Sequence, residues 1–293
     1  MRFRAAVPKD AHALLLQVTQ QLRRVELTSS GVGRRCVLRL SKAGLSFGLV
    51  CAADDCRAWA DLDPALFEAY MVESRCRGEV LLHLSLKQLV RALQKHSGDT
   101  IQLRLAKNAA GAPQLRLASQ KRSVVLRTDV PVKVMRSSDA GAYAPPALAQ
   151  DRGVVLDLPG GGRGVARVVA RLRRLGDRRA TRAAVRPIRL TLAAAGELAV
   201  TARAPTCAVR AFFPDCAAPR GVANAPGAAT RVRVDAGRLA AALGLEKLDP
   251  EALSCEKASD ALRVVAKLRD ALGLVCVYVP ALVDEDEDEE EGG

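Results

Sequence analysis

The sequence predicts an α+β protein that consists of two similar domains, each with two helices packed on antiparallel sheets. Runs with strand-like alternation of apolar residues dominate the chain, and only a few stretches show helical spacing. The same order of elements also occurs twice, which is typical of a duplicated unit. Helices and strands do not alternate along the chain, so a doubly wound parallel sheet is excluded.

The first half opens with a strand over residues 1–7, which Pro8-Lys9-Asp10 ends. A helix follows over residues 12–25, and its apolar stripe consists of Leu14, Leu15, Val18, Leu22 and Val25. Ser85 is a good N-cap for a second helix, whose apolar positions are Leu86, Leu89, Val90 and Leu93. The other alternating runs predict strands over residues 36–40, 44–50, 57–62, 80–84, 101–106, 114–118, 123–128 and 130–135.

The second half repeats this order after an aperiodic stretch at residues 136–152, which contains Pro145-Pro146. Its first helix follows Pro159, and its apolar positions are Val165, Val168, Val169 and Leu172. Asp235 is the expected N-cap of its second helix, whose apolar positions are Leu239, Ala240 and Leu243. Strands are predicted over residues 154–158, 187–192, 196–202, 231–234, 261–267 and 273–279.

A constant offset of 150 residues superposes the two halves. It takes Val18 to Val168, and it takes the cap residue Ser85 to Asp235. The other matched pairs are Leu22 with Leu172, Leu38 with Ile188, Leu40 with Leu190, Leu89 with Leu239, and Leu93 with Leu243. We therefore expect an N-terminal domain at residues 1–135, a connector at 136–152, a C-terminal domain at 153–283 and an acidic disordered tail at 284–293.

The charge of the chain is strongly uneven. The formal net charge is +13, but residues 284–291 alone carry eight negative charges, which leaves +21 for the rest. A body this basic usually meets a polyanion, and nucleic acid is the commonest one. The alternative is an ordinary solvated surface that reflects a bias toward Arg and Ala.

Two of the predicted helices carry basic stripes on the side opposite their apolar residues. The positions recur every three or four residues, and they are Lys87, Arg91 and Lys95 in one helix and Arg163, Arg167, Arg171 and Arg174 in the other. The first helix adds Arg24 and the fourth adds Arg238. Like charges at this spacing destabilise an isolated helix, and residues 160–176 contain no acid. We expect these residues to contact nucleic-acid phosphates without reading base sequence, the alternative being a solvent-exposed helix face.

Other chemistry has little support in the sequence. The run Gly160-Gly161-Gly162-Arg163-Gly164 fits neither dinucleotide-binding nor Walker spacing, so we interpret it as a strand-to-helix turn. The eight cysteines form no C-x-x-C pair, and we expect reduced, mostly buried thiols, no metal and no cofactor. The three histidines are isolated, which argues against nucleophilic catalysis and against an enzyme. No apolar run is long enough for a membrane span, and we expect an intracellular protein.

Several segments in order along the chain resemble a known family. They are MRFRA at residues 1–5, GLSFGLV at 44–50, LSLKQLVRALQ at 84–94, TDVPVKVM at 128–135 and VYVPAL at 277–282. Together they resemble the Hus-one (Hus1) subunit of the checkpoint clamp built from Rad-nine, Rad-one and Hus-one, a relative of the sliding clamp PCNA. The match is loose at residues 205–230, and the acidic tail is not a requirement of the family.

The resemblance implies the DNA-clamp fold and a heterotrimeric ring with Rad-nine-like and Rad-one-like subunits around double-stranded DNA. It also implies a dedicated clamp loader, checkpoint signalling at damage sites, docking of repair enzymes and a nuclear location. In this family helix Lys and Arg face the DNA, and the matching residues here are Lys87, Arg91, Lys95, Arg167, Arg171 and Arg174. Two alternatives remain: a PCNA-like homotrimeric replicative clamp, and a basic RNA- or chromatin-binding protein that forms no ring.

Overall fold

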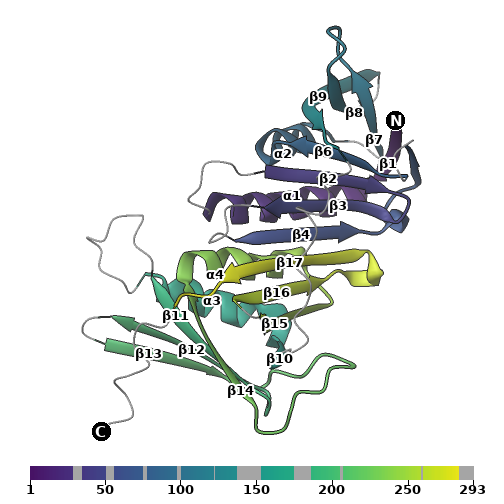
Figure 1. Ribbon diagram of the computed structural model, residues 1–293. Coiled ribbons are helices and arrows are strands. Elements are labelled where there is room, and N and C mark those ends of the chain that lie inside the picture. The colour runs from purple at the N-terminus through teal and green to yellow at the C-terminus, as the bar shows by residue number, and fades with distance from the viewer. Residues whose placement is uncertain are drawn as a thin grey trace, which may run out of the picture. The chain divides into compact units, whose positions relative to one another are not determined.

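A computed structural model describes residues 1–28, 35–50, 56–74, 78–97, 100–121, 123–136, 153–174, 186–204, 207–258 and 260–283 (Figure 1). The chain forms two compact units. Unit 1 comprises Met1–Pro146, Lys247–Glu251 and Ala266–Val277. Unit 2 comprises Ala147–Glu246, Ala252–Val265 and Tyr278–Gly293. The predicted tail and all of the predicted connector except Arg136 lie outside the described residues.

The first half of the chain supplies two helices and nine strands within the described ranges. The helices are α1 (Lys9–Thr28) and α2 (Leu86–Lys95), and a short 3₁₀ turn covers Pro64–Leu66. The strands are β1 (Arg2–Pro8), β2 (Arg35–Ser41), β3 (Gly44–Val50), β4 (Arg57–Leu62), β5 (Ala69–Glu73), β6 (Val80–Leu84), β7 (Thr100–Lys107), β8 (Pro113–Lys121) and β9 (Val124–Val134).

These strands form two antiparallel stretches that share β9. The order is β4-β3-β2-β6-β9 in one stretch and β9-β8-β7-β1-β5 in the other. The end of β9 pairs with β6, where Val134 lies opposite Leu82, and its preceding part pairs with β8, where Val130 lies opposite Leu115. One long strand therefore passes from one sheet into the next and leaves one face of both for the helices.

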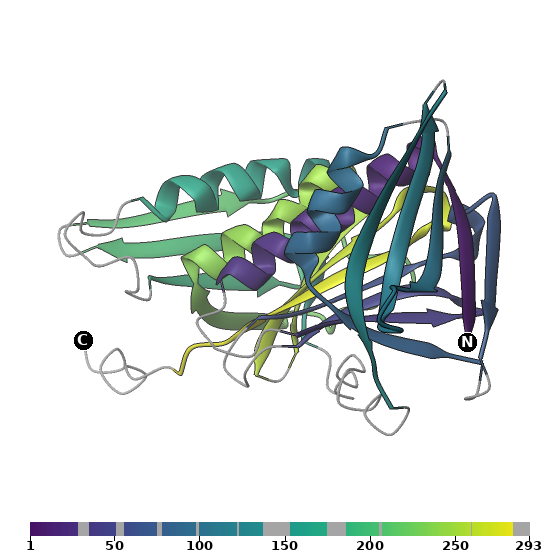
Figure 2. The same ribbon diagram turned by 90° about the horizontal axis from the view of Figure 1, so that it is seen from above.

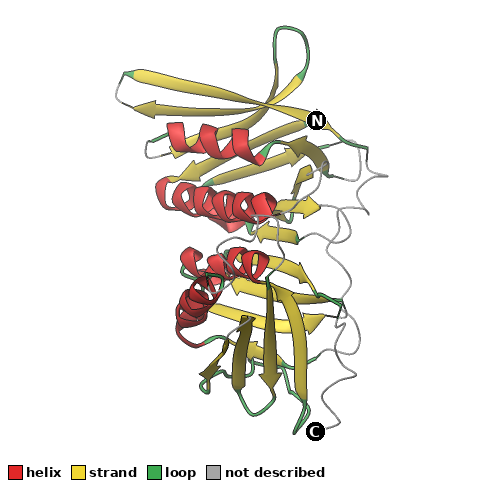
Figure 3. Ribbon diagram, turned by 90° about the vertical axis from the view of Figure 1, so that its left-hand side faces the viewer, coloured by secondary structure: helices red, strands yellow, loops and turns green. Residues whose placement is uncertain are grey.

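The helices of this half bury the apolar stripes that the sequence predicts. Leu15, Val18, Leu22 and Val25 of α1 are at most 2% exposed, and Leu86, Leu89 and Leu93 of α2 are at most 3% exposed. Leu14 and Val90 are only partly covered. The two helices lie side by side on one face of the sheets, as Figures 2 and 3 show. Burying such a stripe supplies most of the stability of a short helix.

The second half supplies two helices and eight strands within the described ranges. The helices are α3 (Arg163–Leu172) and α4 (Ala236–Leu243), with 3₁₀ turns at Pro159–Gly162, Gly244–Leu248 and Arg269–Ala271. The strands are β10 (Val155–Asp157), β11 (Pro187–Ala193), β12 (Glu197–Ala204), β13 (Cys207–Phe213), β14 (Ala229–Asp235), β15 (Ala252–Ala258), β16 (Ala261–Lys267) and β17 (Gly273–Pro280).

Four of these strands form a separate antiparallel sheet in unit 2, in the order β13-β12-β11-β14. Its two faces differ sharply. Ile188, Leu190 and Leu192 of β11 are at most 2% exposed, and they lie on the face toward α3 and α4. The alternate residues Arg189 and Thr191 point to the opposite face, because successive side chains of a strand alternate.

The start of α3 depends on three glycines in the left-handed region. Gly160, Gly161 and Gly162 have φ values of 57°, 64° and 80°. A Cβ on Gly162 would lie 2.4 Å from Cδ2 of Leu253, so a side chain there would displace Leu253, and the left-handed backbone itself favours glycine. The glycine run is therefore a defined turn between β10 and α3, as its interpretation as a strand-to-helix turn predicts.

The internal repeat is visible in matched roles. Ser85 caps α2, where its Oγ accepts from the amide of Gln88 at 3.5 Å, and Asp235 caps α4, where its carboxylate accepts from the amide of Arg238 at 2.9 Å. Strand β2 pairs with β3 and β6, and β11 pairs with β12 and β14. The apolar matched pairs with the offset of 150 are buried in both halves, except that Val168 is only partly covered.

The structure corrects several element boundaries. Strands β5, β13 and β15 were not predicted, and the two strands expected at residues 123–128 and 130–135 are one strand, β9. Asp129, at the junction of the two expected strands, lies opposite Arg116 of β8 and accepts from its Nε at 2.7 Å. Helix α1 is also longer than the expected range of 12–25 at both ends, since it begins directly at Lys9 and ends at Thr28.

We expect Leu22→Ala to lower the free energy of unfolding by about 2–5 kcal/mol, because its side chain is fully buried and truncation leaves a cavity. Leu27→Ala in the same helix is the matched control, since Leu27 is 58% exposed, and it should change stability by less than about 0.5 kcal/mol. Urea unfolding followed by circular dichroism measures both. Equal effects of the two substitutions would contradict the assigned face of α1.

Candidate nucleic-acid interface

Helix α2 carries the basic stripe of unit 1. Lys87, Arg91 and Lys95 are exposed and lie one turn apart, on the side away from Leu89 and Leu93. None of the three basic groups forms an ion pair with an acid in the described ranges. The helix itself contains no Asp or Glu. Its outward surface is therefore a row of cations with nothing on the helix to neutralise it.

Helix α3 carries the corresponding stripe of unit 2. Arg163, Arg167 and Arg171 are exposed and spaced by one turn, while Val165, Val169 and Leu172 are buried on the opposite side. The exposed Arg174 follows the helix, and its amide donates to the carbonyl of Arg171 at 2.9 Å. All four predicted arginines of this stripe therefore lie at the surface of one helical segment. Arg178, Arg179 and Arg182, which the sequence adds to this charge, lie outside the described residues.

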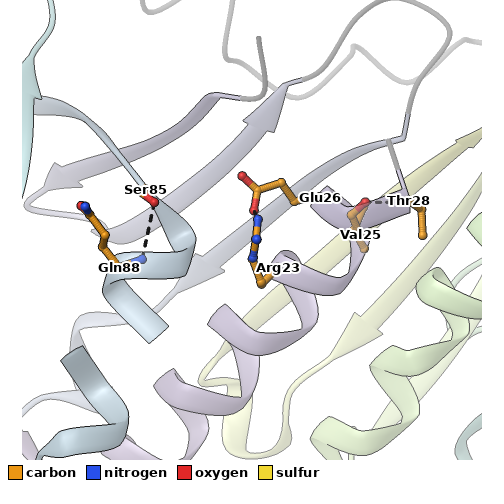
Figure 4. Close-up of polar contacts among 6 residues, drawn as sticks. All are labelled: Arg23, Val25, Glu26, Thr28, Ser85 and Gln88. Atoms are coloured by element: carbon orange, nitrogen blue, oxygen red, sulfur yellow. Dashed lines mark hydrogen bonds and ion pairs between the residues drawn. The ribbon is translucent and has the colours of Figure 1, made fainter. Parts of the chain in front are cut away.

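The two adjacent arginines of helix α1 have different surroundings (Figure 4). Arg23 forms an ion pair with Glu26, a largely buried acid one turn later. Arg24 is exposed, and its Nη1 donates to Oε1 of Gln21 at 3.1 Å. Only Arg24 of this pair therefore offers a full positive charge to a ligand outside the helix.

Helix α4 contributes least to the predicted interface. Arg238 is half-buried, lies in the first turn of the helix and already has an interaction partner. The rest of the helix is Ala, Gly and Leu. We keep Arg238 as a candidate contact, but the exposed cations of the described helices are concentrated on α2 and α3.

Histidines hold α2 against its neighbours in unit 1. His12 of α1 lies with Nε2 3.1 Å from the carbonyl oxygen of Leu93 in α2. His96 ends α2, is 2% exposed, and has Nδ1 2.8 Å from Oγ of Ser119 in β8. Burial lowers the pKa of His96, and the nearby His12 lowers it further. The interior around the end of α2 therefore favours a neutral imidazole.

The sequence also matches a known family. The model of the Hus1-like protein family matches residues 1–265. The chain belongs to the Hus1-like family. No curated protein matches the chain in sequence.

Solved structures of sliding clamps share the fold of this Hus1-like chain. The PCNA2–PCNA3 complex from Sulfolobus tokodaii has a TM-score of 0.66 at 11% identity, covering 95% of this chain and 98% of that chain. Proliferating cellular nuclear antigen from Entamoeba histolytica has a TM-score of 0.69 at 11% identity, covering 96% and 99%. The predicted α+β clamp fold is thereby confirmed.

Family and fold together assign a role. A Hus1-like chain with the PCNA-like clamp fold is a sliding-clamp subunit of the checkpoint type, which acts in DNA binding and DNA repair. The resemblance noted in the sequence is confirmed over most of the chain. Which individual residues face the DNA remains a prediction.

The described part of this Hus1-like chain holds no cluster of three or more His, Cys, Asp or Glu side chains that suits a metal ion. Of its six described cysteines, none is in a disulfide; five are buried and Cys207 is exposed. Burial raises the pKa of the Cys36 and Cys255 thiols. Across the same residues, no helix has the length and apolar character that spanning a membrane would need.

Sequence reasoning missed a second basic surface, on the outer face of the β13-β12-β11-β14 sheet. A hollow of about 420 Å³ there is lined by Arg189, Arg203, Arg210, Arg231 and Arg233. The signal was present in the alternation of Arg with apolar residues, as in Arg231-Val232-Arg233-Val234. Each of these strands alone carries only one or two arginines of the hollow, so the cluster forms only when the four strands pair.

We expect the free energy of unfolding to fall as the pH drops below about 6.5. The folded-state pKa of His96 is lower than its ordinary value of 6.5, so the unfolded chain binds a proton first and gains stability relative to the folded one. His96→Gln removes this titration, and its stability should depend less on pH between 7 and 5.5. Urea unfolding at several pH values tests this, and identical pH profiles would contradict it.

Proposed function

We propose that this chain is one subunit of a heterotrimeric checkpoint clamp that encircles double-stranded DNA, with a Rad-nine-like and a Rad-one-like subunit as neighbours. The observation that carries the proposal is the pair of exposed, acid-free basic stripes on α2 and α3 in a member of the Hus1-like family. The S. tokodaii neighbour, a complex of two different PCNA chains, supports assembly from unlike subunits.

The stripes suit a surface along which DNA slides. Lys and Arg side chains bind phosphate through charge and hydrogen bonds, and phosphates recur along any duplex regardless of sequence. The two outward stripes consist of Lys and Arg separated by Gln, Val, Ala and Gly, without aromatic side chains that would stack on bases. In the proposed ring, α1 to α4 face the hole, and Arg24, Lys87, Arg91, Lys95, Arg163, Arg167, Arg171, Arg174 and Arg238 contact the backbone.

The wider proposal follows the family. Two clamp domains at residues 1–135 and 153–283 are joined by a connector at 136–152, and a clamp loader places the ring on DNA at damage sites in the nucleus. The ring supports checkpoint signalling and repair by holding enzymes on DNA, and the chain itself catalyses no reaction. One His–Ser contact of the described residues, His96 with Ser119, is buried at the end of α2, out of reach of a substrate.

Two alternatives make different physical predictions. A PCNA-like replicative clamp would form a ring from copies of this chain alone, and the fold shared with E. histolytica PCNA supports this as a second candidate. A basic protein without a ring would bind short linear nucleic acid as strongly as closed circles. A ring slides off free ends, so its retention depends on the topology of the DNA as well as on its affinity for phosphates.

We expect the chain purified alone to give no homotrimer in native mass spectrometry, and a one-to-one-to-one complex after coexpression with Rad-nine-like and Rad-one-like subunits. The reason is that unlike edges of the three subunits would complete the ring. A stable homotrimer of this chain would contradict the proposal and favour the replicative clamp.

We expect the change of Arg167, Arg171 and Arg174 to Glu to weaken retention of the assembled ring on nicked circular DNA. The slope of log K against log salt is negative, and losing three phosphate contacts should make it shallower by about three. The matched control changes Lys107, Lys121 and Arg127 to Glu, three exposed cations on β7, β8 and β9. Retention and salt dependence that match the control would show that α3 does not face DNA.

A further inference from the structure

The outer face of the β13-β12-β11-β14 sheet is a cationic hollow that the proposed DNA surface does not use. Its lining residues are Pro187, Arg189, Thr191, Thr201, Arg203, Arg210, Arg231 and Arg233, which come from all four strands. They are the strand positions that alternate with buried residues such as Ile188, Leu190 and Val232, so they point away from α3 and α4.

The strand register brings the arginines together. Arg189 lies opposite Arg233 on β14 and opposite Thr201 on β12, and Thr201 lies opposite Arg210 on β13. Like charges directly opposite each other in a sheet cost stability. An anion over these strands would offset that cost, because each arginine presents several N–H donors to carboxylate oxygens.

One of these arginines is held in place by an aromatic ring. The guanidinium carbon of Arg210 lies 4.3 Å from the centroid of Phe212, whose ring is 58% exposed on the same face. Such a cation–π contact keeps the guanidinium beside the ring, and a guanidinium has five N–H donors, more than one ring can occupy. Among the described residues of these strands, acids occur only at strand ends, at Glu197 and Asp235, and Asp235 accepts from the amides of Arg186 and Arg238.

The chain itself carries a matching anion that starts beside this hollow. The amide of Leu282 donates to the carbonyl of Arg233 at 2.8 Å, and Ala281 bridges Val234 of the same edge strand. The run of eight acids at residues 284–291 begins two residues later. Eight extended residues span up to roughly 26–29 Å, whereas four strands cover only about 14 Å, so the run is long enough to cross the sheet.

We propose that the acidic segment 284–291 binds the arginine hollow on the outer face of the β13-β12-β11-β14 sheet. The attachment at Leu282 keeps the segment at a high effective concentration, of the order of millimolar, so weak individual ion pairs add up to lasting occupancy. The segment thereby covers the outer cations and leaves the helix stripes as the exposed basic surface. This inference stands whether or not the ring assigned to the chain exists.

A full-length variant with a neutral segment tests the proposal, in which every Asp of 284–291 is replaced by Asn and every Glu by Gln. The probe is a fluorescein-labelled peptide of sequence DEDEDEEE, and its anisotropy is measured in 50 mM salt. The neutral variant should bind the peptide about tenfold more tightly than the unaltered chain, whose own segment competes for the hollow. Equal binding to both chains would overturn the proposal.

A matched pair of double variants locates the binding. Adding Arg189→Gln and Arg231→Gln to the neutral variant should weaken peptide binding about tenfold, because two charge-assisted contacts are lost. Adding Arg167→Gln and Arg171→Gln on α3 removes the same charge from the other basic surface and should change binding less than twofold. We expect all variants to fold, since the four arginine side chains lie on solvent-facing surfaces. Circular dichroism of each variant checks this.

Other outcomes also decide the matter. If the α3 pair weakens peptide binding as much as the sheet pair, the peptide follows net charge alone and the assigned site is wrong. If the neutral variant binds a short DNA duplex through Arg189 and Arg231 but not the peptide, the hollow is a phosphate site. Either result overturns binding of the acidic segment.

Discussion

The basic surfaces of this protein depend on the one-sided burial of its short helices. Helix α2 has ten residues and is stable only because Leu86, Leu89 and Leu93 are packed against the strands beneath it. With 3.6 residues per turn, burying those three positions forces Lys87, Arg91 and Lys95 to the opposite side. Helix α3 obeys the same constraint with Val165, Val169 and Leu172. Core packing thus determines where the charge is displayed.

The same reasoning with a period of two governs the four-stranded sheet. Burying Ile188, Leu190 and Leu192 under the helices sends Arg189 and its neighbours to the outer face. Unit 2 therefore displays cations both on its helices and on the far side of its sheet. The eight acids at residues 284–291 offset part of this excess of positive charge within the same chain. In the proposed ring, only the helix stripes follow the duplex, so covering the outer arginines leaves a single basic surface for DNA.

The elements that the sequence predicts well are those with a strong period. Helix stripes, both caps and strands such as β3 and β4 follow from local spacing alone. Strands β5 and β13 escaped prediction because most of their residues are exposed and lack an apolar alternation. Strand β9 was predicted as two strands because Asp129 interrupts the apolar alternation, although the cross-strand partner Arg116 holds Asp129 within one strand. Long-range pairing of this kind is absent from local sequence.

The candidate interface shows the same limit. Spacing identified the cations of α2 and α3, yet it could not tell that Arg23 is neutralised by Glu26 while Arg24 is exposed, because helical phase alone does not fix ion pairing. It also gave Arg238 equal weight, although that side chain is half-buried. The outer arginines become a cluster only when four strands that are distant along the chain are aligned.

The glycine corner before α3 makes the two halves unequal despite their shared pattern. The first half enters its helix through Pro8 and Lys9, and the proline restricts the chain before folding. The second half enters through Gly160, Gly161 and Gly162, each of which loses about 0.5–1 kcal/mol more backbone entropy than alanine would. The two halves therefore share an architecture but differ in the backbone entropy that their first helices lose on folding. Substitution of any of the three glycines would strain the backbone, because each has a positive φ.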